Sequence, residues 1–308
     1  MNEDHEDKLT EPKPIHQAAS SSLLRTILSL AAFIAVDYLI FKSWAAVFLL
    51  VSVILLHESG HFIAMKRFGY QGVNMTFVPF MGAYVSGQAT HFSKVKKLIV
   101  LLAGPLPGII IGMALLVLYQ YSQEEFYYLA ALAFLLLNVF NLLPVSPLDG
   151  GQLVETIFFS GNYLIQIIFL LISLAIVFYL LYQFRSWFLI IIAWFLLIRI
   201  RSLTLTYRVR KELNRKHIPY DCSYDDLTDE HYTLIRDIIV TQSSFLRRRF
   251  SPGEYSIRES ELISYVEKVL MPSYHHPLSR DEKFIFMGVY ILAIVLPIFH
   301  WFLVKGWL

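Results

Sequence analysis

Long apolar stretches without charged residues recur along the chain. Four of them contain no Asp, Glu, Lys or Arg, and they lie between Lys97 and Glu124, Glu125 and Asp149, Glu155 and Arg185, and Lys283 and Lys305. Each stretch is long enough for a helix that crosses a hydrocarbon core of ~30 Å, which takes about 20 residues. The pattern therefore predicts membrane-spanning helices.

Three further apolar segments are shorter or carry ionisable groups. Residues 23–41 contain Asp37, residues 44–65 contain two histidines and a glutamate, and residues 186–198 reach spanning length only when residues 200–205 extend them. Counting these segments gives seven spans, of which the sixth is the shortest. We expect an all-α polytopic membrane protein with about six to seven transmembrane helices.

Composition supports this fold class. Hydrophobic residues make up 56% of the 308 residues and charged residues only 16%, whereas a typical soluble domain has about 25% charged residues. The formal net charge of +2 argues against a nucleic-acid partner held by bulk positive charge. Cys222 is the single cysteine, which excludes an intramolecular disulfide framework and a cysteine-rich metal cluster.

The distribution of charge divides the chain into four regions. Residues 1–22 are polar and acidic, unlike a signal peptide, and predict a disordered cytoplasmic tail. Residues 23–206 form the predicted membrane domain. Residues 207–283 have the balanced charges of a small, α-rich soluble domain, whose role no motif indicates, and residues 284–305 form the last helix.

Lysine and arginine residues gather on one side of the predicted spans. That side carries Arg25, Lys66, Arg67, Lys94, Lys96, Lys97, Arg199, Arg201, Arg208, Arg210, Lys211, Arg215 and Lys216, and the other carries Lys42, Arg185 and Lys305. By the positive-inside rule, the richer side faces the cytoplasm. We expect a protein of the cell inner membrane, with its N-terminus and soluble domain in the cytoplasm and its C-terminus outside.

The second predicted span carries the motif His57-Glu58-Ser59-Gly60-His61. On a helix, residues i and i+4 lie on one face, one turn apart, so both imidazoles can bind one metal ion. Glu58 stands beside that face, where it can take a proton from a water molecule. Ionisable groups within a span are costly without partners, and a divalent cation would compensate them. The alternative is a polar helix face packed against neighbouring spans.

A catalytic zinc site needs a third protein ligand, and Asp149 is the candidate. Pro144 and Pro147 break the end of the fourth span, and Gly150 and Gly151 permit backbone turns that let Asp149 point inward. The predicted topology places Asp149 and the two histidines toward the same, cytoplasmic side. The alternative is a surface turn, where Asp-Gly is common.

These two motifs, together with Ala103-Gly104-Pro105-Leu106 in the third span, resemble those of the site-2 protease family of intramembrane zinc metalloproteases. The resemblance covers roughly residues 44–160. In the family the third-span motif often continues with Ala-Asn, where this chain has Pro107-Gly108. This departure concerns the packing of the third span and not the residues of the metal site.

The resemblance implies that His57, His61 and Asp149 bind one zinc ion and that Glu58 is the catalytic base. It implies a zinc endopeptidase of the lipid bilayer that cuts a membrane-protein substrate in or near its transmembrane helix, in regulated intramembrane proteolysis.

A non-catalytic scaffold or transporter with a structural metal site is the alternative from another class. The presence of Glu58 favours the enzyme, because a structural site needs no base. A prenyl-protein-type membrane metalloprotease is a second enzymatic alternative, although its third ligand is usually a glutamate.

Residues 76–85 follow the metal-binding span and are too short, and too broken by Pro79 and Gly82, to cross a membrane. Their β-branched and aromatic residues predict a re-entrant β-hairpin. We expect its second strand, which contains Gly82, Ala83, Tyr84 and Val85, to bind an unwound substrate by strand addition. The alternative is a loop that only closes the second span against the third.

Two asparagines of the fourth span are also candidates for the site. Asn138 and Asn141 can donate hydrogen bonds to the substrate backbone or to the oxyanion. Helix capping or bonding between helices is the alternative for both residues.

Overall fold

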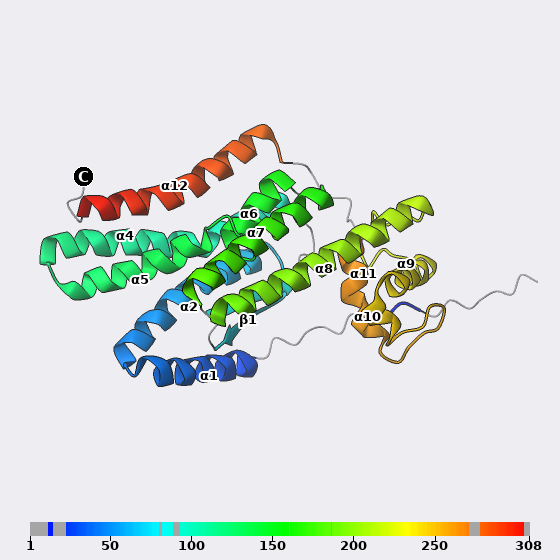
Figure 1. Ribbon diagram of the computed structural model, residues 1–308, viewed down its shortest axis with the longest axis horizontal. Helices are drawn as coiled ribbons and strands as arrows, with labels where there is room; N and C mark the ends of the chain where they lie inside the picture. Colours follow the sequence, from blue (N-terminus) through cyan, green and yellow to red (C-terminus); the bar gives the residue numbers. More distant parts are fainter. Residues whose placement is uncertain are drawn as a thin grey trace, which may run out of the picture. The chain divides into compact units, whose positions relative to one another are not determined.

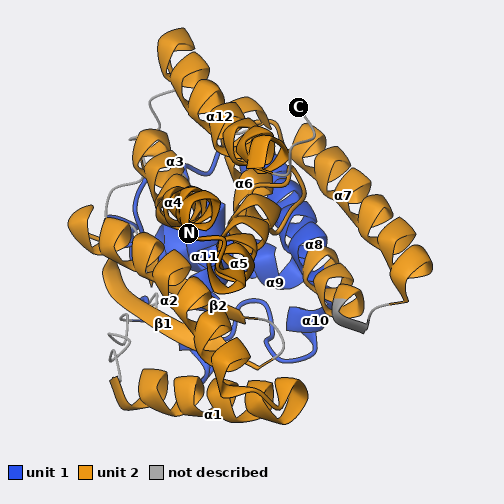
Figure 2. Cartoon of the chain, turned by 90° about the vertical axis from the view of Figure 1, so that its left-hand side faces the viewer, with its two compact units in different colours: residues 1–18, 198–275 blue, residues 19–197, 276–308 orange. Residues whose placement is uncertain are grey.

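The computed structural model describes residues 12–14, 23–79, 82–88, 93–159, 161–185, 187–270 and 278–304. The chain divides into two compact units, which Figure 2 distinguishes by colour. Unit 1 consists of residues 1–18 and 198–275, and unit 2 consists of residues 19–197 and 276–308. The boundary expected between residues 206 and 207 therefore falls inside a helix, α8 (Trp187–Arg215).

Unit 2 is a bundle of helices with one two-stranded sheet (Figure 1). Besides the first part of α8, its elements are α1 (Leu23–Phe41), α2 (Trp44–Arg67), β1 (Gln71–Val78), β2 (Gly82–Gln88), α3 (Lys94–Ala103), α4 (Pro105–Ser122), α5 (Glu125–Asn141), α6 (Asp149–Val154), the π-helix η1 (Glu155–Phe159), α7 (Tyr163–Phe184) and α12 (Arg280–Val304).

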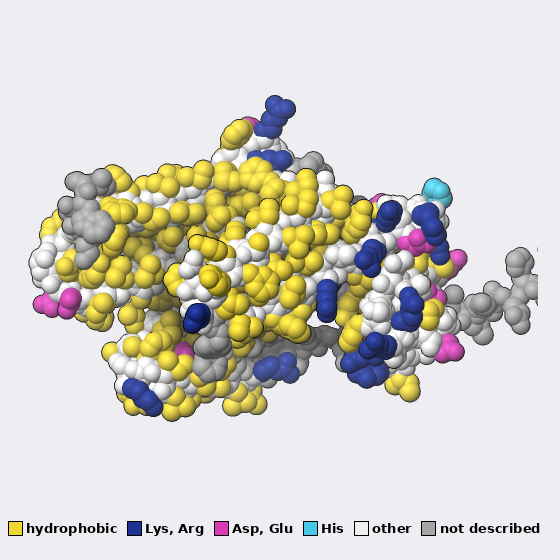
Figure 3. Space-filling model, in the orientation of Figure 1, with side chains coloured by type: hydrophobic (Ala, Val, Ile, Leu, Met, Phe, Trp, Pro, Cys, Tyr) yellow, Lys and Arg dark blue, Asp and Glu magenta, His cyan; other side chains and the backbone are white. Residues whose placement is uncertain are grey.

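Among the described residues, six helical segments are long and apolar enough to cross a membrane. They are Leu23–Phe41, Trp44–Arg67, Lys94–Ser122, Tyr163–Phe184, Leu189–Arg215 and Arg280–Val304. The fourth expected span is the shorter apolar helix Glu125–Asn141, of 17 residues. Hydrophobic side chains cover the face of these helices in Figure 3, and the expected polytopic helical fold is confirmed.

Local sequence signals set several helix ends. Ser43 and Ser93 cap the N-termini of α2 and α3, because their hydroxyl oxygens accept hydrogen bonds from backbone N–H groups in the first turn. Gln123 ends α4 in the left-handed conformation, with φ of 57°. Between α3 and α4, Gly104 is followed by Pro105, whose missing N–H costs nothing at a helix start.

The expected hairpin is confirmed, and its strands are longer than residues 76–85. β1 and β2 pair antiparallel from Val78 opposite Gly82 to Gln71 opposite Gln88, with an irregularity between Gln71 and Asn74. The turn residues 80–81 lie outside the described residues.

Helix α1 covers the outer edge of β1. The Thr26 hydroxyl donates to the Met75 carbonyl at 2.8 Å, and the Phe77 N–H donates to the Ser29 hydroxyl oxygen at 3.1 Å. Side-chain hydroxyls thus satisfy backbone groups that a sheet edge would leave open inside an apolar bundle. Phe33 of α1 and Phe77 of β1 also pack together in a buried cluster with residues of α2.

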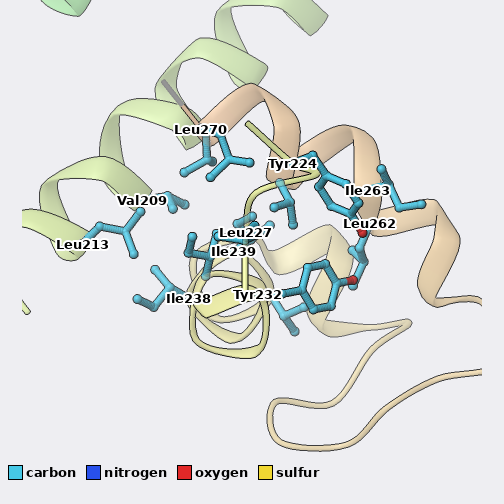
Figure 4. Packing of buried hydrophobic residues seen from close by; sticks show 14 of the residues in the cluster. Val209, Leu213, Tyr224, Leu227, Tyr232, Ile238, Ile239, Leu262, Ile263 and Leu270 are labelled. Carbon is cyan, nitrogen blue, oxygen red and sulfur yellow. The ribbon is translucent and has the colours of Figure 1, made fainter. Parts of the chain in front are cut away.

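Unit 1 is built around α9 (Asp229–Gln242), with α10 (Ser244–Arg247), the 3-10 helix η2 (Glu259–Leu262), α11 (Ile263–Val269) and the last turns of α8. Val209 and Leu213 of α8 are fully buried in one cluster with Ile239 of α9 and Ile263 of α11 (Figure 4). Burial of one such side chain contributes roughly 1.5–3 kcal/mol, so unit 1 has a hydrophobic core of its own.

The described part of the N-terminal tail, which belongs to unit 1, contacts the other segment of that unit, residues 198–275. Lys13 hydrogen-bonds to Asp229 and to backbone carbonyls of the segment before α9. The prediction of a disordered tail over residues 1–22 did not anticipate this contact, because the partners lie 211 to 216 residues away in the sequence. Residues 1–11 and 15–22 lie outside the described residues.

Candidate metal centre

Helix α2 brings His57 and His61 together one turn apart. Both side chains are buried, with 4% and 8% of their surfaces exposed. Their Nε2 atoms lie 3.2 Å from each other. The i, i+4 spacing therefore places the two imidazoles as a helix geometry predicts.

Asp149, the first residue of α6, closes the group. Its Oδ2 atom lies 3.2 Å from Nε2 of His57 and 3.2 Å from Nε2 of His61. The three atoms form a triangle with equal sides, and they are the set of candidate metal-binding atoms found among the described residues.

The two glycines after Asp149 allow close backbone packing. A Cβ on Gly150 would lie 2.0 Å from the Leu142 carbonyl oxygen, and one on Gly151 would lie 2.4 Å from the Val145 carbonyl carbon. Neither glycine has a positive φ. The sequence interpretation gave them conformational freedom as their role, whereas the structure shows that the essential property is the absence of a side chain.

The outer nitrogen of each imidazole faces a hydrogen-bond acceptor. Nδ1 of His61 lies 2.8 Å from the carbonyl oxygen of Val100 in α3. Nδ1 of His57 lies 2.8 Å from Oδ1 of Asn138 in α5. The Asn138 amide is oriented by its own donor group, because Nδ2 donates to the Phe134 carbonyl at 2.7 Å. Both Nδ1 atoms therefore carry the proton of the neutral ring.

With Nδ1 protonated, the Nε2 atoms of both neutral histidines are lone-pair acceptors. They converge with a carboxylate oxygen, also an acceptor, at separations of 3.2 Å. Three such acceptors repel one another unless a cation lies among them. A tetrahedral zinc site with bonds of about 2.0–2.1 Å separates its ligand atoms by about 3.3 Å, so the donor types and their spacing fit zinc.

Glu58 lies beside this triangle and is buried, with 8% of its surface exposed. Its carboxylate interacts electrostatically with His57, His61 and Asp149, and it accepts a hydrogen bond from the backbone N–H of Val85 in β2. The hairpin thus contacts the acidic residue directly.

Small residues make room for this arrangement where α2, α3, α4 and α5 meet. A Cβ on Gly104 would lie 2.3 Å from Nε2 of His61, and one on Gly60 would lie 1.9 Å from the Ala103 carbonyl oxygen. A Cβ on Gly108 would lie 2.1 Å from Nδ2 of Asn138. Gly108 lies in the stretch where the chain departs from the family motif, and its missing side chain accommodates the asparagine that orients His57.

The remaining predicted residues lie outside the triangle. Asn141 is half-buried at the end of α5, and no described hydrogen bond joins it to the three metal-binding candidates. Gly82, Ala83 and Tyr84 lie on β2, where Tyr84 is 53% exposed. Their role toward a substrate remains a prediction.

Two contributors to the site had little or no signal in the sequence. The Val100 carbonyl is a backbone group, and any residue in that place would supply it. Asn138 was recognisable as a polar residue in an apolar span. Its predicted roles were hydrogen bonding to the substrate or bonding between helices, and the structure supports the second, because Asn138 of α5 bonds to His57 of α2.

Comparison with known proteins identifies relatives of this region. The matching family model is Peptidase family M50, over residues 45–125 and 119–181. Zinc metalloprotease MJ0392 of Methanocaldococcus jannaschii is 32% identical over 120 residues, which are 37% of this chain and 34% of that protein. Stage IV sporulation protein FB of Bacillus subtilis is 29% identical over 120 residues, which are 37% of this chain and 40% of that protein.

Among solved structures, the site-2 protease from Methanocaldococcus jannaschii has a TM-score of 0.41 and 24% identity, and the match covers 58% of this chain and 87% of that one. The chain matches between 34% and 40% of the length of the two curated relatives. The stretch that the family model matches first, residues 45–125, includes the histidine motif and the third-span motif of this chain. By these matches residues 45–181 of the chain are similar to peptidase family M50 and to a zinc metalloprotease.

Proposed function

We propose that this protein is an intramembrane zinc endopeptidase that hydrolyses a peptide bond in or near the transmembrane segment of a membrane-protein substrate. The observation that carries the proposal is the convergence of Nε2 of His57, Nε2 of His61 and Oδ2 of Asp149 at 3.2 Å, with the Glu58 carboxylate beside them. Three ligand atoms leave one position of a tetrahedral site open, as in catalytic zinc sites.

Each residue has a distinct role in this proposal. His57, His61 and Asp149 hold one zinc ion, which would acidify a water molecule and polarise the scissile carbonyl. The Glu58 carboxylate accepts the proton of the attacking water and returns it to the nitrogen of the leaving amine. The N–H of Val85 holds the Glu58 carboxylate in place between these two transfers.

The substrate must be extended at the scissile bond, because a helix hides its carbonyls in internal hydrogen bonds. In an antiparallel pair, backbone groups point alternately toward the partner strand and away from it. On β1, the backbone groups of Met75 and Phe77 point away from β2 and bond to α1. Their partners on β2 are Val85 and Ala83. The N–H of Val85 points away from β1, toward Glu58. By this alternation Ala83 also points outward, and we propose that its N–H and C=O pair with the substrate.

The same alternation refines the role of the other strand residues. The backbone groups of Tyr84, between Ala83 and Val85, point toward Thr76 of β1 and belong to the hairpin itself. We therefore propose that Gly82 and Tyr84 contact the substrate beside Ala83 without pairing their backbone groups with it. We propose that Asn141, at the end of α5, donates a hydrogen bond to the substrate backbone or to the oxyanion.

The distribution of Lys and Arg supports the expected orientation. We propose that the protein lies in the cell inner membrane with its N-terminus and unit 1 in the cytoplasm, its C-terminus outside, and its cleavage site toward the cytoplasmic side. Cleavage there would release the cytoplasmic part of the substrate, as regulated intramembrane proteolysis requires.

A membrane proteome comparison tests the proposed activity. Cells that carry the wild-type chain, Glu58→Gln or the exposed-site control Glu124→Gln would be compared by quantitative mass spectrometry of their membranes. We expect at least one full-length membrane protein to accumulate with Glu58→Gln only. Equal membrane proteomes for all three chains would instead support a non-catalytic scaffold or transporter with a structural metal site.

A further inference from the structure

The N-terminal tail is bound by unit 1 through its residues Pro12, Lys13 and Pro14. We propose that unit 1 contains a recognition site for an extended peptide with a lysine between two prolines, and that these three residues of the chain's own tail are its resident ligand. This site lies within unit 1 and is independent of the metal centre of unit 2.

The ammonium group of Lys13 is matched by three acceptors. Nζ donates to the backbone carbonyls of Tyr224 at 2.8 Å, Asp225 at 2.7 Å and Leu227 at 2.6 Å. A lysine ammonium has three N–H donors and no acceptor, so the set uses its full capacity. Nζ also lies 5.4 Å from the centre of the Tyr224 ring, within the range of a cation–π interaction.

The peptide backbone around Lys13 is bound as specifically as its side chain. The N–H of Lys13 donates to Oδ1 of Asp229 at 2.9 Å. The Tyr255 hydroxyl donates to the Pro12 carbonyl at 2.8 Å, and the Tyr224 hydroxyl donates to the Pro14 carbonyl at 2.9 Å. Each of the three tail residues therefore has a partner on unit 1.

The prolines suit this mode of binding. Each proline has a fixed φ and no N–H, and Pro14 biases Lys13 toward extended backbone. An extended, proline-flanked segment loses little conformational entropy when it is bound, which is the basis of proline-rich peptide recognition by aromatic grooves. The tail thus has the chemistry of a short linear ligand.

The receptor side is held in place by the core of unit 1. Tyr224 and Leu227, whose carbonyls bind the ammonium, belong to the buried cluster of Figure 4. Burial raises the pKa of the Tyr224 hydroxyl, which keeps it protonated as a donor. The loop that carries Tyr255 is fixed by Arg236, which donates to the carbonyls of Ser251 at 2.7 Å and Glu254 at 2.5 Å.

The charge of the receptor segment favours a cationic ligand. Asp221, Asp225, Asp226 and Asp229 lie within nine residues of one another around the binding carbonyls. Because the ammonium is bound by carbonyls in a fixed cluster, an uncharged side chain of the same length would leave those carbonyls unpaired. The site should therefore discriminate strongly between lysine and methionine.

A peptide-binding experiment with the full chain in detergent tests the proposal. A fluorescein-labelled peptide with the sequence of residues 9–17 would be titrated with wild type, with Lys13→Ala, which frees the site, and with Lys211→Ala, an exposed lysine elsewhere on unit 1. We expect Lys13→Ala to bind the peptide at least about tenfold more tightly than wild type or Lys211→Ala does. In wild type and in Lys211→Ala the chain's own tail occupies the site at a high effective concentration and competes with the peptide.

Two further measurements use the Lys13→Ala background. A peptide with methionine in place of its lysine should bind at least about tenfold more weakly, and Tyr255→Phe should weaken binding of the lysine peptide about two- to tenfold. The proposal is overturned if the lysine and methionine peptides bind equally, if wild type and Lys13→Ala bind alike, or if no saturable binding occurs up to about 1 mM.

Discussion

At the residue scale, the candidate metal centre includes groups besides its three candidate ligands. Asn138 and the Val100 carbonyl select the ring nitrogen that each histidine turns toward the centre. Such outer hydrogen bonds fix the tautomer and the orientation of a ligating imidazole, and their loss typically lowers metal affinity 10–100-fold. The site is thus a property of four helices and not of the histidine motif alone.

Asn138→Ala should weaken zinc binding about 10–100-fold, because His57 loses the acceptor of its Nδ1–H. The measurement is a chelator competition on the purified chain in detergent. Asn141→Ala, one turn further along α5 and without a described bond to the site, serves as the matched control. Equal affinities for the two variants would show that Asn138 does not orient His57.

Gly104→Ala should displace His61 and reduce bound zinc by at least about tenfold. Its new Cβ would stand 2.3 Å from the Nε2 atom that points at the metal position, and the nearby α3 backbone cannot withdraw without repacking the bundle. Gly288→Ala in α12, whose Cβ would meet nothing within 4 Å, is the control. If Gly104→Ala keeps zinc as Gly288→Ala does, the close packing assigned to this position is wrong.

The sequence predicted much of this geometry and missed part of it for clear physical reasons. Helical spacing placed His57 and His61 on one face without reference to other elements. Asp149 lies 88 residues from His61, and the sequence alone left a surface turn as an alternative for it. The Val100 carbonyl has no side-chain signature, so only the fold reveals it.

At the element scale, the hairpin is held from both sides. Thr26 and Ser29 of α1 bond to β1, and Glu58 of α2 bonds to β2 at Val85. Because α1 satisfies backbone groups at the edge of β1, we propose that a substrate strand pairs with the edge of β2. The order of elements around the hairpin therefore determines the proposed direction of substrate approach.

Ala83→Pro should impair substrate cleavage while the zinc content stays at the wild-type level. Proline removes the N–H of Ala83, which points away from β1, and proline is tolerated at such an edge position. Ala83→Val, which keeps the N–H, should retain most of the cleavage. Cleavage assays on the accumulated substrate and zinc analysis of the same preparations measure both effects. Normal cleavage by Ala83→Pro would leave the hairpin with a packing role only.

The sequence predicted the hairpin but could not reveal which of its edges is covered by α1. Its β-branched residues, Pro79 and Gly82 gave the strands and the turn region. The covering of β1 depends on Thr26 and Ser29, which read as ordinary polar interruptions of the apolar helix α1. Their hydroxyls bond to β1 about 50 residues away, and no local pattern contains that information.

At the scale of the whole molecule, we propose a topology from the charge pattern and the helices. If each of the six candidate spans and the shorter α5 crosses the membrane once, Lys66–Arg67 and the end of α8 face the same side of the membrane. The seven crossings counted from the sequence include α5, which is shorter than the six candidate spans found among the described residues. Orientation then rests on the positive-inside rule.

Reporter fusions test this topology directly. Fusions after Gly69 and after Lys216 should report the cytoplasm, and fusions after Gln123 and after Leu308 should report the outside. A phosphatase and a fluorescent protein, active on opposite sides of the membrane, would be fused at each point. An external signal after Lys216 would reverse the proposed placement of unit 1.

We propose one zinc site, formed by His57, His61 and Asp149 beside a base that is not a ligand. Its most direct test is the zinc-to-protein ratio of purified wild type, Asp149→Ala and Glu58→Gln, measured by inductively coupled plasma mass spectrometry after dialysis. We predict about one zinc per chain for wild type and for Glu58→Gln, and at least about a tenfold lower ratio for Asp149→Ala. Wild-type zinc in Asp149→Ala, or an equal loss in Glu58→Gln, would contradict the assignment of ligands and base.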